Sequence, residues 1–259
     1  MNIVVCVKQT PDTAAAVAVE NGKVTWGDAP LVLNPWDEFA VEQALRTKEA
    51  HGGTVTAISL GPDGAREALK QALAMGCDSA VLLQDTAFDG ADTLVVAKAL
   101  ASAICKMESV DLVFFGRTSV DSDTGLTPAQ AARYLTWPSL TLVAAVLGLD
   151  PSAKTIEVER MLEEGRQIVR SPLPAVVSVV KEIGEPRYPS FMGIRKASKA
   201  EIPTWSAADI GLTGPTAALT WPAVEAPPKV ESRCEMITGD TPEAIAAALA
   251  DRLVEEKVL

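Results

Sequence analysis

The sequence predicts an α/β protein: a doubly wound, mostly parallel, Rossmann-like sheet of the kind that binds adenine nucleotides, followed by an extended C-terminal arm. Three observations predict it. Short apolar runs alternate with amphipathic helical patterns along the first part of the chain. Most of these runs are apolar at every position, as expected of parallel strands covered by helices on both faces. Near residue 184 the periodicity is lost and proline and glycine become frequent.

Five apolar runs are expected to form the parallel strands. They cover residues 3–7, 54–60, 80–84, 112–116 and 175–180. Helical patterns lie between the first four of them, at 37–50, 64–76 and 90–107. After residue 150, two segments of alternating polarity are joined through "EEG", which predicts an antiparallel hairpin.

The chain is expected to have two parts. Residues 1–183 form the α/β nucleotide-binding domain, and residues 184–259 form a recognition loop and a C-terminal arm. The arm carries Trp205 and Trp221, and it ends in a helix predicted from Thr241 as N-cap and Pro242 at the first helical position. Because a solvated tail has little use for large apolar side chains, we expect the arm to wrap around a partner.

Composition excludes several classes of function. The 259 residues are 48% hydrophobic and 22% charged, an ordinary globular balance, and a net charge of −11 argues against nucleic acid and anionic membranes as partners. We expect neither a membrane-spanning segment nor a signal peptide, and therefore a cytoplasmic protein. Four scattered cysteines without a CxxC pair predict no metal site.

Conventional catalytic motifs are missing from the sequence. It has one histidine, His51, and lacks GxSxG, GxxxxGK[ST] and a GxGxxG after the first strand. We therefore predict no catalytic residues of the acid–base or nucleophilic kind.

A binding site is predicted at the carboxyl ends of the strands, where ligands of open parallel sheets bind. Hydroxyls, amides and the cations Lys8 and Arg117 gather there, which suits a nucleotide whose phosphate is held by loop N–H groups. Four segments should meet at this edge: "CVKQTP" (6–11), "LNPWDE" (33–38), "LGP" (60–62) and "GRTSVDSDTG" (116–125).

Other interpretations remain open at this point. The segment "NPWDE" also fits a plain helix start, in which Asn34 turns the chain and two acidic residues favour the helix dipole. The segment "DSDT" matches the DxDx[TV] pattern of haloacid-dehalogenase phosphatases, which bind magnesium, but five residues separate Asp121 from the strand end at Phe115. An ATP-binding regulatory domain of the universal-stress type would share the sheet without needing the arm.

Seven segments together resemble the β subunit of electron-transfer flavoproteins over nearly the whole chain. Each is weak alone, but their combination in this order is specific. The segments are "VVCVKQTPDT" (4–13), "NPWDEFAVEQALRTKE" (34–49), "ALAMGCDSAVLL" (72–83), "GADTLVVAKALA" (90–101), "DLVFFGRTSVDSDTG" (111–125), "LPAVVSVVKEIGEPRYPS" (173–190) and "GIRKASKAEIP" (193–203).

The resemblance implies a heterodimer in which the partner α subunit holds an FAD and this chain binds a second adenine nucleotide. The redox chemistry would reside in bound flavin, so this chain would be an electron carrier subunit rather than an enzyme by itself. We expect Asp121 and Asp123 to accept backbone N–H bonds, while Ser122 and Thr124 contact phosphate. The nucleotide contacts carried over are Cys6, Val7, Lys8, Asn34, Pro35, Trp36, Asp37, Leu60, Gly116, Arg117, Thr118, Ser119, Val120, Asp121, Ser122, Asp123, Thr124, Gly125, Leu126 and Thr127.

The resemblance implies that this nucleotide is either AMP, as a structural ligand, or a second FAD, as in electron-bifurcating members that oxidise NADH and pass electrons on to ferredoxin. The pattern "DSDTGLTPA" resembles the bifurcating pattern "DGDTAQVGP" and favours FAD, although Leu126 and Pro128 depart from it. The resemblance also implies an acyl-CoA dehydrogenase-type partner, recognised by an apolar residue at Phe191. The residues expected to contact this partner are Phe191, Met192, Arg195 and Lys196.

Overall fold

The structure is a computed structural model that describes residues 1–228 and 234–258. The strands are β1 (Asn2–Cys6), β2 (Gln9–Pro11), β3 (Ala18–Glu20), β4 (Lys23–Thr25), β5 (Leu31–Leu33), β6 (Thr54–Leu60), β7 (Ser79–Leu83), β8 (Leu112–Gly116), β9 (Ser139–Asp150), β10 (Thr155–Leu162), β11 (Gly165–Pro172), β12 (Ala175–Val179) and β13 (Thr204–Trp205). The α-helices are α1 (Pro35–His51), α2 (Arg66–Met75), α3 (Thr93–Lys106), α4 (Thr127–Leu135), α5 (Phe191–Ala197) and α6 (Pro242–Glu255). Short 3-10 turns cover Asp63–Ala65, Thr86–Phe88, Lys181–Ile183 and Ala208–Ile210.

One large sheet dominates the fold. Its nine strands run in the order β11-β10-β9-β12-β8-β1-β6-β7-β13. Every pair from β9 to β13 is parallel, whereas β10 and β11 are antiparallel to their neighbours. The predicted α/β class with a doubly wound, mostly parallel sheet is therefore confirmed, as are the five parallel strands and the hairpin.

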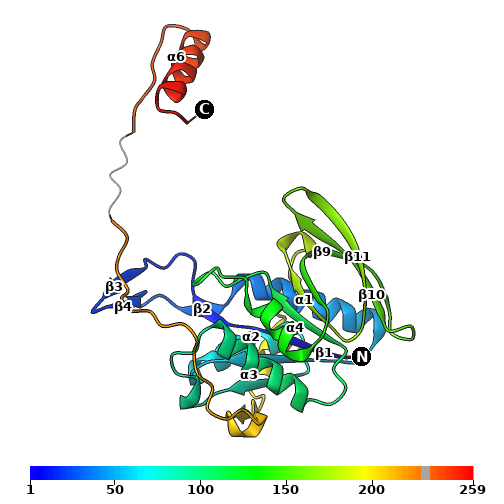
Figure 1. Cartoon of the computed structure of the whole chain (residues 1–259). Coiled ribbons are helices and arrows are strands. Elements are labelled where there is room, and N and C mark those ends of the chain that lie inside the picture. The colour runs from blue at the N-terminus through cyan, green and yellow to red at the C-terminus, as the bar shows by residue number, and fades with distance from the viewer. Residues whose placement is uncertain (229–233, 259) are drawn as a thin grey trace. The chain divides into compact units, whose positions relative to one another are not determined.

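Helices cover both faces of this sheet, and the alternation of side chains along β1 shows why. Ile3, Val5 and Val7 belong to a core cluster that also contains residues of α1 and α2. Val4 and Cys6 belong to a second cluster, built with α3 and α4. Figure 1 shows the helices on the two sides of the parallel strands. A strand that is apolar at every position is thus buried on both of its faces.

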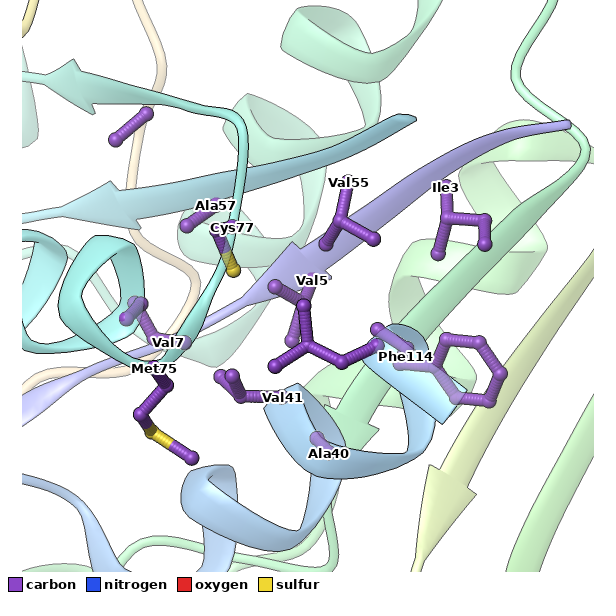
Figure 2. Packing of buried hydrophobic residues seen from close by; sticks show 14 of the residues in the cluster. Ile3, Val5, Val7, Ala40, Val41, Val55, Ala57, Met75, Cys77 and Phe114 are labelled. Atoms are coloured by element: carbon purple, nitrogen blue, oxygen red, sulfur yellow. The ribbon is translucent and has the colours of Figure 1, made fainter. Parts of the chain in front are cut away.

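Figure 2 shows part of the first cluster at close range. Val5 of β1 and Phe114 of β8 lie beside Ala40 and Val41 of α1, and all four side chains are buried. The small Ala40 allows the helix to approach the sheet closely. This packing fixes the first turn of α1 beside the carboxyl ends of β1 and β8.

Strand β9 continues the sheet beyond its parallel part. Its first residues pair with β12 in parallel, and its second half pairs with β10 antiparallel across two register shifts. Elsewhere, β2 pairs with β5 and β3 pairs with β4 in two small ribbons. Sequence analysis did not predict these ribbons, β9 or α4.

Residues 184–224, which were expected to belong to the arm, pack on the sheet and the core of this chain. Strand β13 pairs in parallel with β7, and Ile202, Ile210 and Leu212 are buried in the clusters of this chain. The first compact unit accordingly runs from Met1 to Val224, whereas the sequence placed a boundary at residue 183. The segment around Phe191, expected to be a loop, is the short helix α5.

The second unit, Glu225–Leu259, contains helix α6. The Thr241 side chain accepts a hydrogen bond from the Ala244 N–H, and Pro242 occupies the first turn, as predicted. No residue of α6 is buried. Among the described residues, none of the helices has both the length and the apolar character that crossing a bilayer requires.

Candidate functional site

The strand order of the large sheet indicates where the candidate site lies. From β1 the chain builds the sheet in one direction through β6 and β7, and in the other direction through β8 and β12. The order therefore reverses between β1 and β8, and such a switch point opens a crevice at the carboxyl ends of the strands. A pocket of about 450 Å³ lies there, lined by residues that follow β1, β6 and β8.

Most of the predicted nucleotide contacts line this pocket. Those that do are Cys6, Val7, Lys8, Asn34, Asp37, Leu60, Gly116, Arg117, Thr118, Ser119, Ser122, Thr124, Gly125, Leu126 and Thr127. Five do not line it: Pro35 and Trp36 lie in the first turn of α1, and Val120, Asp121 and Asp123 lie in the loop after β8. All four segments expected at this edge contribute lining residues.

The buried side chain of Asn34 holds the loop after β8. Its Nδ2 donates to the Thr118 carbonyl at 2.8 Å, and its Oδ1 accepts the Val120 N–H at 3.2 Å. Asn34 therefore does more than start a helix: it makes two bonds to a loop more than 80 residues away. Within the loop, Asp123 has a φ of 46° and its N–H donates to the Ser119 carbonyl, which turns the chain.

One of the two loop aspartates, Asp121, does not act as predicted. Both carboxylate oxygens of Asp121 accept from Lys8 Nζ, at 2.6 and 2.7 Å, rather than from backbone N–H groups. The expectation of backbone bonds is therefore wrong for Asp121. Lys8 therefore compensates the charge of Asp121, which lies outside the pocket lining.

Asp37 joins three elements at the base of the pocket. It is only 6% exposed, and one carboxylate oxygen accepts the Lys8 N–H at 2.8 Å. Burial raises the pKa of Asp37 to about 7, against the opposing effect of hydrogen bonds from Lys8, Asn34 and Gly116. A Cβ on Gly116 would lie 2.5 Å from Asp37 Oδ1, so this strand end has room for glycine alone.

Cys6 contributes an apolar wall rather than a nucleophile. Burial, and secondarily the nearby Asp37 charge, raise the pKa of its thiol well above the ordinary value. The thiol is therefore protonated at neutral pH. With Leu60, Phe115 and Leu100 it forms the apolar part of the lining.

Another set of lining residues suits an anion. Residues at the N-termini of α3 and α4, including Thr93 and Thr127, line it together with the loop after β8. Helix N-termini present free N–H groups and a positive partial charge. Arg117, whose guanidinium lies 5.6 Å from the centre of the Trp36 ring, is a cation of the lining, and Lys8 is a second one that is already paired with Asp121.

One buried polar atom supports a bound ligand. Thr118 is one of the residues that line the pocket. Its hydroxyl is shielded from solvent and has no hydrogen-bond partner within residues 1–228 and 234–258. A buried hydroxyl without a partner is costly, so it fits a site that a polar ligand group completes. The residues present therefore fit an adenine nucleotide.

Sequence reasoning missed several lining residues. They are Ala91, Asp92, Thr93, Val96, Leu100, Phe115, Pro128, Leu219 and Trp221. The start of α3 could have been found, because it follows β7 at the same edge of the sheet. Leu219 and Trp221 come from a segment without periodicity, and nothing local in the sequence places them here.

A group of exposed apolar side chains lies on and beside α5. Tyr188, Phe191, Met192 and Ile194 are large apolar side chains with exposed fractions of 96%, 80%, 70% and 53%. Arg195 and Lys196 are exposed beside them. Ser190 caps the helix by accepting the Gly193 N–H, and Gly193 lies so close to the Ala74 carbonyl of α2 that a Cβ would collide with it. The predicted partner-binding residues thus lie together on one anchored helix.

Fold and site together define a doubly wound α/β protein with a ligand pocket at its switch point. A sequence model of the electron transfer flavoprotein domain matches residues 24–210. The chain therefore belongs to the electron transfer flavoprotein family, and its relatives identify it as a β subunit of that family, a component of an electron-transfer complex with an α subunit.

Three relatives illustrate the similarity. The caffeyl-CoA reductase-Etf complex subunit CarD of Acetobacterium woodii is 38% identical over 265 residues, with both chains fully covered. The electron transfer flavoprotein subunit beta of Thermoanaerobacterium thermosaccharolyticum is 39% identical over 269 residues, again with both chains fully covered. Protein FixA of Azorhizobium caulinodans is 37% identical over 217 residues, which cover 82% of this chain and 77% of that protein.

Proposed function

We propose that this chain binds an adenine nucleotide in the switch-point pocket and, paired with its α subunit, carries electrons between an acyl-CoA dehydrogenase-type flavoenzyme and another redox carrier. The observation that carries this proposal is the pocket itself, whose lining combines apolar side chains with residues from two helix N-termini and from a hydroxyl-rich loop. The relative whose name places it in a caffeyl-CoA reductase complex supports a CoA-ester flavoenzyme as the partner.

The two halves of the pocket have different roles in this proposal. Cys6, Leu60 and Phe115 offer flat apolar contact to a ring, while Ser122 and Thr124 offer hydroxyls to phosphate. Loop N–H groups and Arg117 add positive potential. A bound flavin would supply the electron-transfer chemistry, and this chain would hold it, orient it and exclude water around its apolar half.

We favour FAD over AMP as the ligand. Besides the loop after β8, the lining includes Leu219 and Trp221, two large apolar side chains that a ligand larger than an adenosine phosphate could contact. In this version the complex reacts with NADH by electron bifurcation, with ferredoxin as one acceptor. In the alternative version AMP is a structural ligand and the α subunit holds the one flavin.

Two surfaces would bind protein partners. The patch on α5 centred on Phe191 would dock on the dehydrogenase, with Arg195 and Lys196 facing acidic groups at its edge. Helix α6, with exposed apolar residues such as Leu249 and Val254, would dock on the α subunit. The resulting interface is expected to exceed about 1,600 Å².

The flavin count of the purified heterodimer tests this proposal and separates its two versions. Two flavins per heterodimer, with reduction by NADH, support the FAD version. One flavin together with one AMP supports the structural version. A heterodimer without a nucleotide other than the FAD of the α subunit would refute both.

A further inference from the structure

A strap formed by residues 214–224 runs along one wall of the switch-point pocket. Its attachment is specific: Asp92, the N-cap residue of α3, accepts the Ala218 N–H at 2.7 Å and the Leu219 N–H at 3.1 Å through Oδ2. The other oxygen of the same carboxylate accepts the Val95 N–H at 2.9 Å. One side chain therefore caps a helix and fixes the strap beside it.

These hydrogen bonds also compensate the negative charge of the Asp92 carboxylate at this wall. The hydrogen bond from the Val95 N–H is the main cause that lowers the pKa of Asp92; burial opposes it, and the hydrogen bonds from Ala218 and Leu219 of the strap lower it further. The carboxylate is ionised, but three N–H groups point at it. An anionic ligand nearby therefore meets a carboxylate whose charge is already compensated.

The strap places two large apolar side chains at the pocket. Leu219 and Trp221 both line it, yet 62% of Leu219 and 84% of Trp221 are exposed. An indole so exposed gains little from the packing of this unit, although Trp221 lines the same pocket as Leu126 and Arg117. A flat aromatic ring that is free on one side of a nucleotide pocket is suited to stacking.

We propose that the strap closes this pocket and that Trp221 stacks on the heteroaromatic ring of the bound nucleotide. This inference rests on the proposed function, since it names a further contact of the same ligand. The nucleotide would bury the exposed indole face, and Asp92 would act as a positioning residue by fixing the strap at Ala218 and Leu219. The ring is either adenine or isoalloxazine, both of which are planar π systems.

The test is equilibrium binding of AMP and of FAD to the heterodimer after removal of the nucleotide from this chain, with the FAD of the α subunit kept in place. Trp221→Ala should weaken binding about tenfold, because stacking on one aromatic side chain contributes on that scale. Trp221→Phe should recover most of the affinity. The matched control is Trp26→Ala, because Trp26 is half-buried and lies outside the pocket lining.

A second variant tests the attachment of the strap. Asp92→Asn keeps one side-chain oxygen that can cap α3 but loses the second acceptor, which holds the strap. Like Trp221→Ala, this variant should therefore bind the nucleotide more weakly than the wild type. Its melting temperature should not change. Quenching of tryptophan fluorescence on binding should be largest in the wild type and much reduced in Trp221→Phe.

The outcomes are distinguishable. Equal losses for AMP and FAD place adenine on Trp221, and a loss for FAD alone places isoalloxazine there; both support stacking. If Trp221→Ala binds both nucleotides as tightly as the wild type, the inference is overturned while the proposed function stands. If the wild type itself binds neither nucleotide, the proposed function fails as well.

Discussion

The Nε atom of Arg187 lies 2.7 Å from Oε2 of Glu42, a carboxylate whose side chain is only 5% exposed. Arg187 also pairs with Glu49, and Arg46 binds the other oxygen of Glu42 and the Glu185 carbonyl. These residues connect α1 to the segment that leads into α5. The network therefore fixes the base of the exposed apolar patch proposed to dock on the dehydrogenase.

Replacing Arg187 by alanine should destabilise the fold by about 3 kcal/mol, because it leaves a buried carboxylate without its main partner. Burial by itself would raise the pKa of Glu42, but the hydrogen bonds from Arg187, together with one from Arg46, hold it below the ordinary value. The stabilisation is therefore present above the unfolded pKa near 4.5 and is lost as pH falls through the lower folded value. Urea unfolding at several pH values measures it.

The control for that experiment is Arg166→Ala. Arg166 pairs with Glu159 on the β10–β11 hairpin, but its side chain is exposed, so the change should cost less than about 1 kcal/mol. Equal losses in the two variants would show that the Arg187 network is no stronger than a surface ion pair.

Phe191→Ala should weaken electron transfer to the partner dehydrogenase by about 2 kcal/mol or more, the effect of removing an apolar anchor. Because 80% of Phe191 is exposed, fold and flavin content should stay unchanged. Steady-state kinetics with the dehydrogenase as varied substrate measures the change in KM.

Val17→Ala serves as the matched control, since Val17 is similarly exposed but lies far from α5 in the sequence. An unaltered KM in Phe191→Ala, or loss of flavin from that variant, would mean that the helix has a structural role instead.

Asp37→Asn should change how stability depends on pH. The folded pKa of about 7 lies above the ordinary 3.8, so the native state takes up a proton between these values that the unfolded chain does not. The contribution of the Asp37 carboxyl group to the free energy of unfolding is therefore highest below about pH 4 and falls as pH rises towards 7. Relative to the wild type, the variant should be more stable at about pH 8 than at about pH 5. A difference in melting temperature that is constant across this range would contradict the raised pKa.

Gly116→Ala should disturb the base of the pocket, where Gly116 lies against Asp37. The added methyl would lie 2.5 Å from Asp37 Oδ1 and 2.6 Å from the Trp36 carbonyl carbon, so the strand end or the start of α1 must shift. We expect a loss of about 1–3 kcal/mol in stability and weaker nucleotide binding. Gly148→Ala is the control, because its methyl would meet nothing closer than 4.0 Å.

The parallel core could be predicted because its signals are local. The run Leu112–Gly116 is apolar at every position, and the structure buries every one of its residues. The cap at Thr241 could be predicted for the same reason, since its acceptor bond to Ala244 spans three residues. Such features depend on neighbours in the sequence.

What could not be predicted depends on contacts between distant segments. Asn34 holds Thr118, Lys8 pairs with Asp121, and Asp92 holds the strap, and none of these pairs has a spacing that identifies it. Strand β13 has only two residues and no pattern of its own, and it forms because β7 offers a free edge. The sequence indicated where the pocket would be, but not how its walls are held.

The measurement that tests the central claim most directly is the number of adenine groups in the purified heterodimer. Denaturing extraction followed by chromatography counts them whether they come from FAD or AMP. In the proposed function the nucleotide of this chain adds to an FAD held by the α subunit, so we predict two adenine groups per heterodimer, and close to one in a heterodimer carrying Gly116→Ala. A wild-type value of one would contradict the claim that the switch-point pocket of this chain holds a nucleotide.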